Sequence, residues 1–294
     1  MILFPNAKIN LGLNVIDKRS DGFHDIETVF YPIDLCDALE IVPSLDGHFA
    51  FTSSGLKIPG EQASNLCIKA CNLLLPEIIK HHCCEKSETS LYASHDPVPA
   101  IFIHLHKVIP LGAGLGGGSS DGTHTLRLLN DLFNLCLTDS QMLDYARQLG
   151  SDCAFFIRNS PVFATERGDV FNSIEVDLSG YTILLVIPYI HINTAEAYTM
   201  IRPFKPPQSI PMIIRQPVES WKEALINDFE LPVTGKYPII GEIKQKLYEL
   251  GALYAAMSGS GSALFSIFNH DPGKITCFPG CFVWKTIASK VSGC

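Results

Sequence analysis

The rest of this chain is organised around one glycine-rich stretch, Pro110-Leu111-Gly112-Ala113-Gly114-Leu115-Gly116-Gly117-Gly118-Ser119-Ser120-Asp121-Gly122. The apolar run Ala100–Ile109 before it is typical of a strand, and the apolar residues after it recur at helical spacing: Leu126, Leu129, Phe133 and Cys136. Glycines let a backbone come close to a ligand, and the first N–H groups of a helix attract anions. The stretch therefore predicts a phosphate site. The alternative is a tight turn with Ser119 or Ser120 as an ordinary N-cap.

Two better-known phosphate loops do not fit this stretch. Gly112, Gly114 and Gly117 satisfy the dinucleotide pattern G-x-G-x-x-G, but a second helical pattern, Ser140–Leu149, stands where that fold needs a strand. A P-loop needs Gly-Lys followed by Ser or Thr, and neither Gly-Lys pair of this chain has that continuation. Any phosphate is therefore held by backbone N–H groups and hydroxyls.

Composition narrows the function classes. The net charge of -8 argues against nucleic acid or an anionic membrane as the main partner, because both require a basic surface. No apolar run approaches the roughly 18 to 20 residues of a membrane span, and the N-terminus does not resemble a signal peptide, so a cytoplasmic protein is expected. The ten cysteines are scattered and are expected to be reduced, and His81-His82-Cys83-Cys84 lacks the spacing of a structural zinc site.

The N-terminal residues Met1–Ile16 alternate as a strand does, which places Lys8 and Asn10 on the same face. An ammonium beside an amide can hold a hydroxyl and a phosphate oxygen. The alternative is an edge-strand lysine that keeps the sheet soluble. After this strand, Ser20-Asp21-Gly22 predicts a turn that presents Phe23 and His24, an aromatic ring and an imidazole suited to a flat heterocycle or to an ordinary hairpin.

The rest of the chain alternates between short strands and helices. Pro32 and Pro43 are expected to punctuate short strands between residues 27 and 58. Helices are predicted over 65–75, 140–149, 221–229 and 239–250, with a further helix start at 193–198. Irregular segments are predicted over 80–99 and 202–217, and strands from residue 160 onward, including 181–187 and a hairpin-like return over 251–268.

Three single residues have an ordinary alternative to a functional role. Asn65 caps or begins its helix, Asp152 stands at a turn where an N-cap aspartate is common, and Tyr198 fits a half-buried position on its helix.

Three motifs together resemble those of the GHMP small-molecule kinases. The glycine stretch is similar to the second motif of that family, Pro5–Leu11 (PNAKINL) to its N-terminal motif, and Met257–Ala263 (MSGSGSA) to its C-terminal glycine loop. The run Arg19–Asp25 (RSDGFHD) resembles the members of the family whose substrate carries a cytidine diphosphate group.

The resemblance implies an α+β fold of two domains with mixed and antiparallel sheets, residues 1–158 and 159–294, and an active site in the cleft between them. It implies ATP-dependent phosphorylation of the 2-hydroxyl of a methylerythritol linked to cytidine diphosphate, in the non-mevalonate route to isoprenoid precursors. Mg²⁺ is expected to accompany ATP, while no metal-ligand residues are predicted in the protein itself. A monomer or homodimer is expected.

The resemblance also assigns roles to residues. Asp152 is implied as the catalytic base and Lys8 as the cation beside the accepting hydroxyl. The nucleotide-binding set comprises Asn65, Lys107, Pro110, Leu111, Gly112, Ala113, Gly114, Leu115, Gly116, Gly117, Gly118, Ser119 and Ser120. The substrate-binding set comprises Asn10, Phe23, His24, Tyr198, Gly259 and Ser260, with Phe23 standing where the family often has tyrosine.

Two other functions remain as alternatives at this point. A GHMP kinase for a different alcohol is expected to lack the Asp21-Gly22-Phe23-His24 run, and a non-catalytic nucleotide-binding module is expected to lack Lys8 or Asp152. A Rossmann-type oxidoreductase is disfavoured by the missing second strand.

Overall fold

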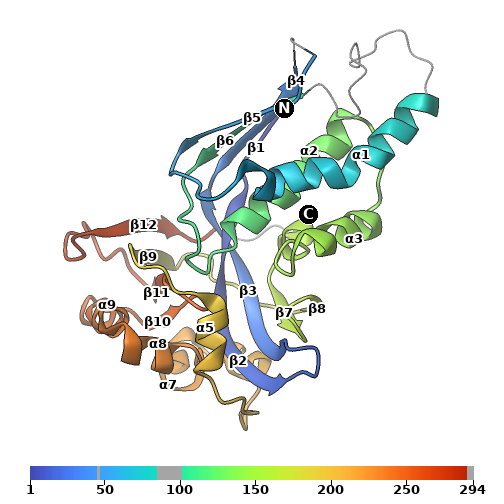
Figure 1. The fold of residues 1–294 in the computed structure, drawn as a ribbon. Helices are drawn as coiled ribbons and strands as arrows, with labels where there is room; N and C mark the ends of the chain where they lie inside the picture. The colour runs from blue at the N-terminus through green and yellow to red at the C-terminus, as the bar shows by residue number, and fades with distance from the viewer. Residues whose placement is uncertain (45–46, 85–100, 290–294) are drawn as a thin grey trace. The chain divides into compact units, whose positions relative to one another are not determined.

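The computed structural model describes residues 1–44, 47–84 and 101–289 (Figure 1). The chain divides into two interleaved units. Residues 1–6, 35–111 and 117–158 make up unit 1, and residues 7–34, 112–116 and 159–294 make up unit 2. The division predicted from the sequence, 1–158 and 159–294, stays a prediction. The two units differ from it in that residues 7–34 and 112–116 group with the C-terminal half of the chain.

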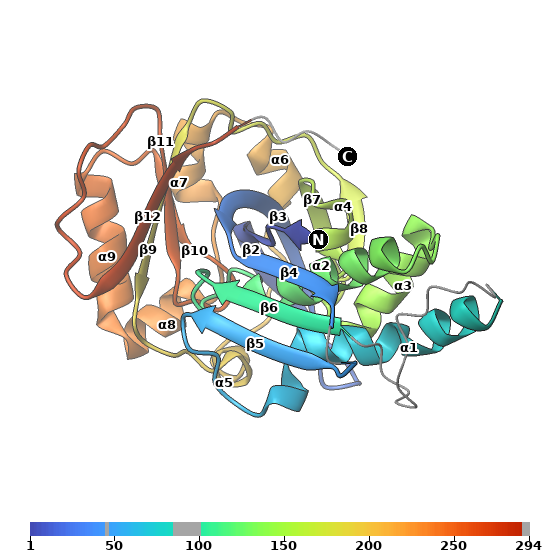
Figure 2. The same ribbon diagram turned by 90° about the horizontal axis from the view of Figure 1, so that it is seen from above.

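Unit 1 is a four-stranded mixed sheet covered by helices (Figure 2). The strand order is β1-β4-β6-β5, with β5 parallel to β6 and the other pairs antiparallel. Helix α2 packs on β4 and β1, and α1 and α3 pack on α2. The elements are β1 (Ile2–Leu3), β4 (Ala38–Pro43), β5 (Ala50–Gly55), β6 (Ile101–Lys107), η1 (Gln62–Ser64), α1 (Leu66–Cys84), α2 (Gly117–Leu132), α3 (Asp139–Leu149) and α4 (Phe155–Arg158).

Two helices of unit 1 differ in length from the sequence prediction. Helix α1 continues through Pro76 to Cys84, because Leu74 and Ile78 bury one face on both sides of the proline. The predicted irregular segment 80–99 is therefore wrong for residues 80–84, and residues 85–99 lie outside the described part of the chain. Helix α2 ends at Leu132, where Asn134 adopts a positive φ of 48°, so Phe133 and Cys136 do not extend its buried face.

Unit 2 contains two sheets and five helices among its described residues. The first sheet has the order β2-β3-β7-β8 and the second, all antiparallel, has the order β10-β11-β9-β12. Helix α9 packs on β9, β10 and β11. The elements are β2 (Asn6–Lys18), β3 (His24–Cys36), β7 (Val162–Thr165), β8 (Val170–Ser173), β9 (Thr182–Pro188), β10 (Tyr254–Met257), β11 (Leu264–Phe268), β12 (Cys281–Ile287), α5 (Thr194–Thr199), α6 (Ile210–Ile214), η2 (Val218–Ser220), α7 (Trp221–Ala224), α8 (Glu230–Lys236) and α9 (Pro238–Glu249).

The α+β class with mixed and antiparallel sheets is confirmed, but three local predictions in unit 2 are wrong. Pro32 does not interrupt β3, which runs unbroken to Cys36. The predicted loop 202–217 contains the short helix α6, whose Ile210, Ile213 and Ile214 are buried and whose Pro211 stands in the first turn, where proline is tolerated. The predicted helix 221–229 ends at Ala224, because Leu225 is extended.

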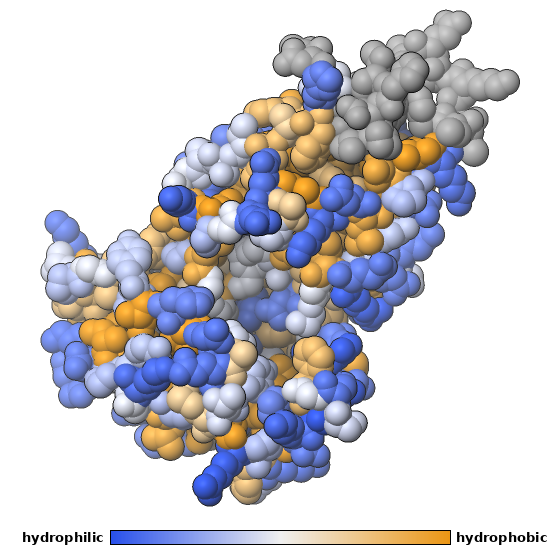
Figure 3. Space-filling model, in the orientation of Figure 1, coloured by the Kyte–Doolittle hydropathy of each residue, from blue (hydrophilic) through white to orange (hydrophobic). Residues whose placement is uncertain are grey.

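The visible surface mixes apolar and hydrophilic residues in small groups (Figure 3). Across the described ranges, no helix combines the length and the apolar character that a membrane span needs.

A buried charge cluster joins three segments of unit 1. Lys107, at the end of β6, is 1% exposed, and its Nζ donates to Asp121 Oδ2 at 2.7 Å and to a carboxylate oxygen of Asp37. Asp37 Oδ1 also accepts from Val108 N at 2.6 Å and Ile109 N at 2.9 Å. The cluster therefore fixes the backbone that leads into the glycine stretch and ties it to α2.

Removal of Asp37 should destabilise the protein strongly. In Asp37→Ala, Lys107 keeps one of its two carboxylates and two buried N–H groups lose their acceptor, so we expect a loss of about 3 to 5 kcal/mol in the free energy of unfolding. Urea denaturation measures this loss. The control Asp144→Ala removes a largely exposed carboxylate that pairs with Arg147, which should cost less than about 1 kcal/mol. Equal stability of the two variants would contradict the structural role of the cluster.

The imidazole of His124 on α2 is 5% exposed, and its Nδ1 donates to Ser120 O at 2.8 Å. Burial lowers the pKa of His124 from 6.5 to about 4. Below pH 6.5 the unfolded chain takes up a proton at this ring while the folded chain does not. The stability that the neutral His124 imidazole contributes to the folded chain is therefore complete above pH 6.5 and is lost as the pH falls toward 4.

The free energy of unfolding should accordingly fall with acidification in a way that depends on His124. We expect the parent chain to lose about 2 kcal/mol more between pH 7 and pH 5 than His124→Gln, which does not titrate. Urea denaturation of both chains at the two pH values measures the difference. An identical pH dependence in the two chains would rule out the buried neutral imidazole.

Candidate active site

The glycine stretch forms a connection from β6 to α2 that only glycine adopts without strain. Gly112, Gly114 and Gly116 have φ values of 64°, 81° and 69°, in the left-handed region that other residues avoid. Helix α2 begins at Gly117, inside the stretch, so Ser119 and Ser120 lie in its first turn. The N-cap interpretation of these serines is therefore wrong. The first N–H groups of α2 belong to motif residues and have no carbonyl one turn earlier in the helix.

A cavity of about 380 Å³ in unit 1 brings together three of the residues predicted to bind the nucleotide, Asn65, Leu111 and Gly118. A Cβ atom at Gly118 would meet nothing within 4 Å, so the helix presents bare backbone there. Asn65 also caps α1, because its Oδ1 accepts from Cys67 N at 2.8 Å.

Asp121 lines the same cavity and was missed by the sequence analysis. Its Oδ1 is buried and has no hydrogen-bond partner among the described residues. Burial raises the pKa of Asp121 well above its ordinary value, and Lys107 opposes that rise only in part. No sequence signal pointed to Asp121, because the burial of Lys107, which requires carboxylates nearby, is visible only in the structure.

Lys8 and Asn10 point the same way from β2, as the alternation predicted. Lys8 is 3% exposed, and its Nζ donates to Asn10 Oδ1 at 2.6 Å and lies 4.6 Å from the centre of the Phe30 ring. Asn10 Nδ2 donates to Thr28 Oγ1 at 3.0 Å. A buried lysine cannot serve as a solvated edge charge, so that alternative is wrong. The structure instead supplies a preorganised cation.

Asp152 lies in unit 1, in the turn between α3 and α4. Helix α4 begins at Phe155, so Asp152 does not occupy its N-cap position, and the capping interpretation is wrong. Thr123 of α2 donates through Oγ1 to Cys153 O at 2.9 Å, which holds this turn against the helix that follows the glycine stretch.

Two of the predicted heterocycle-binding side chains are together in unit 2. The rings of His24 and Tyr198 stack with centroids 4.6 Å apart and an angle of 16° between their planes. Tyr198 also meets Phe229 edge-on at 4.9 Å. Phe23, by contrast, is 57% exposed and has the Arg167 guanidinium over its ring at 5.4 Å.

The loop Met257–Ala263 packs directly on residues 112–116. Ser258 Oγ donates to Gly114 O at 2.8 Å, and Ala263 N donates to Ala113 O at 3.0 Å. In the same loop, Ser260 Oγ lies 2.9 Å from Thr194 Oγ1 at the start of α5. Residues 112–116 of the glycine stretch and the loop Met257–Ala263 are therefore held together by hydrogen bonds in unit 2.

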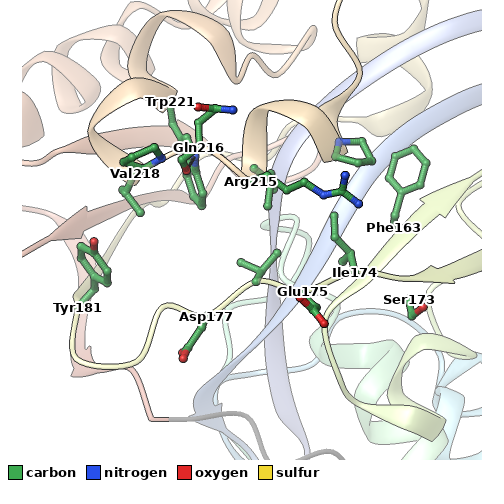
Figure 4. Close-up of a pocket in the computed structure, with 14 residues that line it drawn as sticks. Phe163, Ser173, Ile174, Glu175, Asp177, Tyr181, Arg215, Gln216, Val218 and Trp221 are labelled. Atoms are coloured by element: carbon green, nitrogen blue, oxygen red, sulfur yellow. Dashed lines mark hydrogen bonds between the residues drawn. The ribbon is translucent and has the colours of Figure 1, made fainter.

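A larger cavity of unit 2, of about 940 Å³, contains none of the predicted site residues. In Figure 4, Arg215 at the end of α6 points toward Phe163 and Ile174, and Trp221 and Tyr181 line the other end. Its lining does not resemble the glycine-rich backbone expected to hold phosphate.

Comparison with known proteins agrees with this arrangement. The family model described as the GHMP kinases N terminal domain matches residues 67–160, and that described as GHMP kinases C terminal matches residues 213–275. A 4-diphosphocytidyl-2-C-methyl-D-erythritol kinase of Bacteroides fragilis is 47% identical over 290 residues, covering 97% of this chain and 99% of the relative. The kinase of that name from Azobacteroides pseudotrichonymphae is 51% identical, covering 91% and 93%.

Solved structures are similar over the same length. A crystal structure of 4-(cytidine 5'-diphospho)-2C-methyl-D-erythritol kinase superposes with a TM-score of 0.73 at 28% identity, covering 91% of this chain and 90% of the other. The mevalonate kinase of Methanococcus jannaschii has a TM-score of 0.65 at 14% identity and covers 97% of both chains, which shows the shared fold alone. The chain belongs to the GHMP kinase family, among its 4-diphosphocytidyl-2-C-methyl-D-erythritol kinases.

Proposed function

We propose that this chain transfers the γ-phosphoryl group of ATP to the 2-hydroxyl of 4-diphosphocytidyl-2-C-methyl-D-erythritol, giving the 2-phosphate and ADP. The observation that carries the proposal is the identity of 47% and 51% to kinases of that name over more than nine tenths of the chain. The activity belongs to the non-mevalonate synthesis of isoprenoid precursors.

The nucleotide is assigned to the glycine stretch and the cavity beside it. Backbone N–H groups of Gly112–Ser120 hold the phosphates, and the cavity lined by Asn65, Leu111 and Gly118 accepts the adenine end of ATP. Pro110 and Lys107 fix the entry to the stretch. The unpartnered Oδ1 of Asp121 supports this assignment, because an amino group of the base supplies the donor that the protein lacks.

Mg²⁺ is assigned to the bound phosphates rather than to a site built by the protein. In proteins that bind nucleotides, Mg²⁺ takes most of its ligands from phosphate oxygens and water, with one or two from the protein. Ser119 or Ser120 would supply a hydroxyl to the metal or to a phosphate, and the ion would neutralise charge on the transferred group.

Asp152 and Lys8 are assigned to the reacting hydroxyl. Asp152 accepts the proton of the 2-hydroxyl, and the Lys8 ammonium lowers the free energy of the oxyanion that develops. Lys8 suits this role because its buried Nζ is directed by Asn10, with which it forms a short hydrogen bond. The hydrogen bond from Thr123 to Cys153 O fixes the turn that carries Asp152. A fixed turn suits a catalytic base, because the base must lie at a defined position relative to the hydroxyl.

The cytidine end of the substrate is assigned to unit 2. The His24 imidazole hydrogen-bonds the edge of the cytosine, and Tyr198 and Phe23 offer ring faces to it. Asn10, Gly259 and Ser260 contact the methylerythritol diphosphate part. A cytoplasmic monomer or homodimer, acting on small molecules without nucleic acid or membrane, completes the proposal.

Release of ADP in the presence of ATP and Mg²⁺ tests the reaction and its base. Turnover is expected with the cytidyl substrate and not with mevalonate, homoserine or galactose. Asp152→Asn should lower kcat by about 10² to 10⁴, because the amide cannot accept the proton. Asp144→Asn, on the exposed face of α3, is the matched control and should keep full activity.

Three outcomes would count against the proposal. Turnover with another alcohol only would retain the kinase class and reject the cytidyl substrate. ATP binding without any turnover would favour a nucleotide-binding module. Full activity of Asp152→Asn would reject its role as the base.

Removal of either ring of the His24–Tyr198 pair should weaken substrate binding specifically. A lost stacking or edge contact to a base costs about 1 to 3 kcal/mol, so KM for the cytidyl substrate should rise about tenfold or more in His24→Ala and Tyr198→Ala. KM for ATP should not change. His106→Ala, on unit 1, is the control imidazole. A rise in KM for ATP alone would place the nucleotide, and not cytidine, at this pair.

A further inference from the structure

Four consecutive residues at the start of α8, Asn227-Asp228-Phe229-Glu230, contact three separate parts of the proposed site within unit 2. They carry none of the family motifs that the sequence analysis identified. We call them the 227–230 segment.

Asn227 is 1% exposed, and every hydrogen-bonding group of its side chain is used except one lone pair. Its Nδ2 donates to Met257 O at 2.7 Å and to Gly259 O at 2.9 Å, and its Oδ1 accepts from Phe229 N at 3.0 Å. Two donors on one nitrogen are what an amide supplies and a carboxylate lacks. The two carbonyls flank Ser258, so one side chain fixes the backbone on both sides of that serine.

The neighbours of Asn227 hold the surrounding elements. Glu230 accepts from Met257 N, and Asp228 Oδ2 accepts from Val15 N of β2 at 2.7 Å. Phe229 packs edge-on against Tyr198 at 4.9 Å. The 227–230 segment therefore joins the strand of Lys8, the loop Met257–Ala263 and the aromatic pair in one bonded structure.

The loop that Asn227 holds is the support of the first glycine loop. Ser258 Oγ donates to Gly114 O, and it also lies within hydrogen-bond distance of Asn10, 3.2 Å from the backbone N and 3.3 Å from Oδ1. A Cβ atom on Gly259 would be 3.3 Å from Gly114 Cα. Any displacement of residues 257–259 therefore displaces both Asn10 and residues 112–116.

We propose that Asn227 is a positioning residue for phosphoryl transfer. It touches no reactant and acts through the loop Met257–Ala263, by holding Ser258 where it orders Gly114 and Asn10. The inference rests on the proposed function for its kinetic consequence, while its structural part, the ordering of the loop by Asn227, does not.

Asn227→Asp tests the inference with almost no change of shape. The carboxylate places oxygen against the carbonyl oxygens of Met257 and Gly259, so the loop must move away. We expect kcat with the cytidyl substrate to fall about 100-fold, as a misplacement of about 1 Å does in other enzymes, and the Kd of ADP measured by calorimetry to rise, because residues 112–116 move with the loop. Asn227→Ser, which keeps one donor, should lose less.

Tyr254→Phe is the matched control. The Tyr254 hydroxyl is buried and donates to Leu225 O at 2.9 Å, two residues before Asn227, without contacting the loop. We expect Tyr254→Phe to lose about as much stability as Asn227→Asp and to keep the kcat of the parent. Unchanged kcat in Asn227→Asp, or an equal loss of kcat in Tyr254→Phe, would overturn the proposal.

Hydrogen exchange of the backbone amides in the loop supplies a readout that needs no turnover and no substrate. Faster exchange at residues 257–263 in Asn227→Asp, with exchange in β9 and β11 unchanged, is the expected result, and it holds even if the parent acts on another alcohol. If Asn227→Asp does not fold, the same exchange measurement on Asn227→Ser decides. Exchange at 257–263 identical to the parent in a folded variant would reject the role of Asn227.

Discussion

A Cβ atom at Gly114 would lie 2.0 Å from the carbonyl oxygen of Ser258, closer than any side chain permits. This close approach of two backbones is the constraint on which the proposed site of unit 2 depends. It requires glycine at 114 and lets Ser258 Oγ reach Gly114 O, while Lys8 N donates to Leu115 O at 2.9 Å on the other side of the loop. Three motifs that lie about a hundred residues or more apart in the sequence are thereby fixed against one another.

Two buried lysines belong to the proposed site, Lys107 in unit 1 and Lys8 in unit 2. The Lys107 ammonium is paired with the carboxylates of Asp37 and Asp121, which offset its charge. Lys107 therefore positions the backbone at the entry of the glycine stretch and contributes little net electric field. Lys8 Nζ donates to Asn10 Oδ1 and lies 4.6 Å from the centre of the Phe30 ring. In a chain of net charge -8 that acts on ATP, any positive potential at the phosphates must be local, and the backbone N–H groups of the glycine stretch are a source of it.

The sequence predicted what is encoded in a single stretch of chain. The glycine-rich stretch, its flanking strand and helix, the shared face of Lys8 and Asn10, and the helix beginning at Asn193 with Tyr198 on it all depend on local pattern and are confirmed. Contacts between distant segments were beyond the sequence. Nothing near Asn227 indicates that its amide holds Met257 and Gly259, and nothing near Asp37 indicates that it pairs with Lys107. Proline at position 32 misled the prediction, because it lies inside β3, and the predicted helix 65–75 stopped short of Pro76, which lies inside α1.

We propose that the backbone of the glycine stretch, and no lysine of P-loop type, holds the nucleotide phosphates. The measurement that tests it most directly is the change in backbone amide chemical shifts of the ¹⁵N-labelled protein on titration with ADP and Mg²⁺. The expected result is saturable shifts concentrated at Gly112–Ser120, with smaller shifts at Asn65 and Leu66. Shifts concentrated around Arg215 and Trp221, with Gly112–Ser120 unchanged, would contradict it.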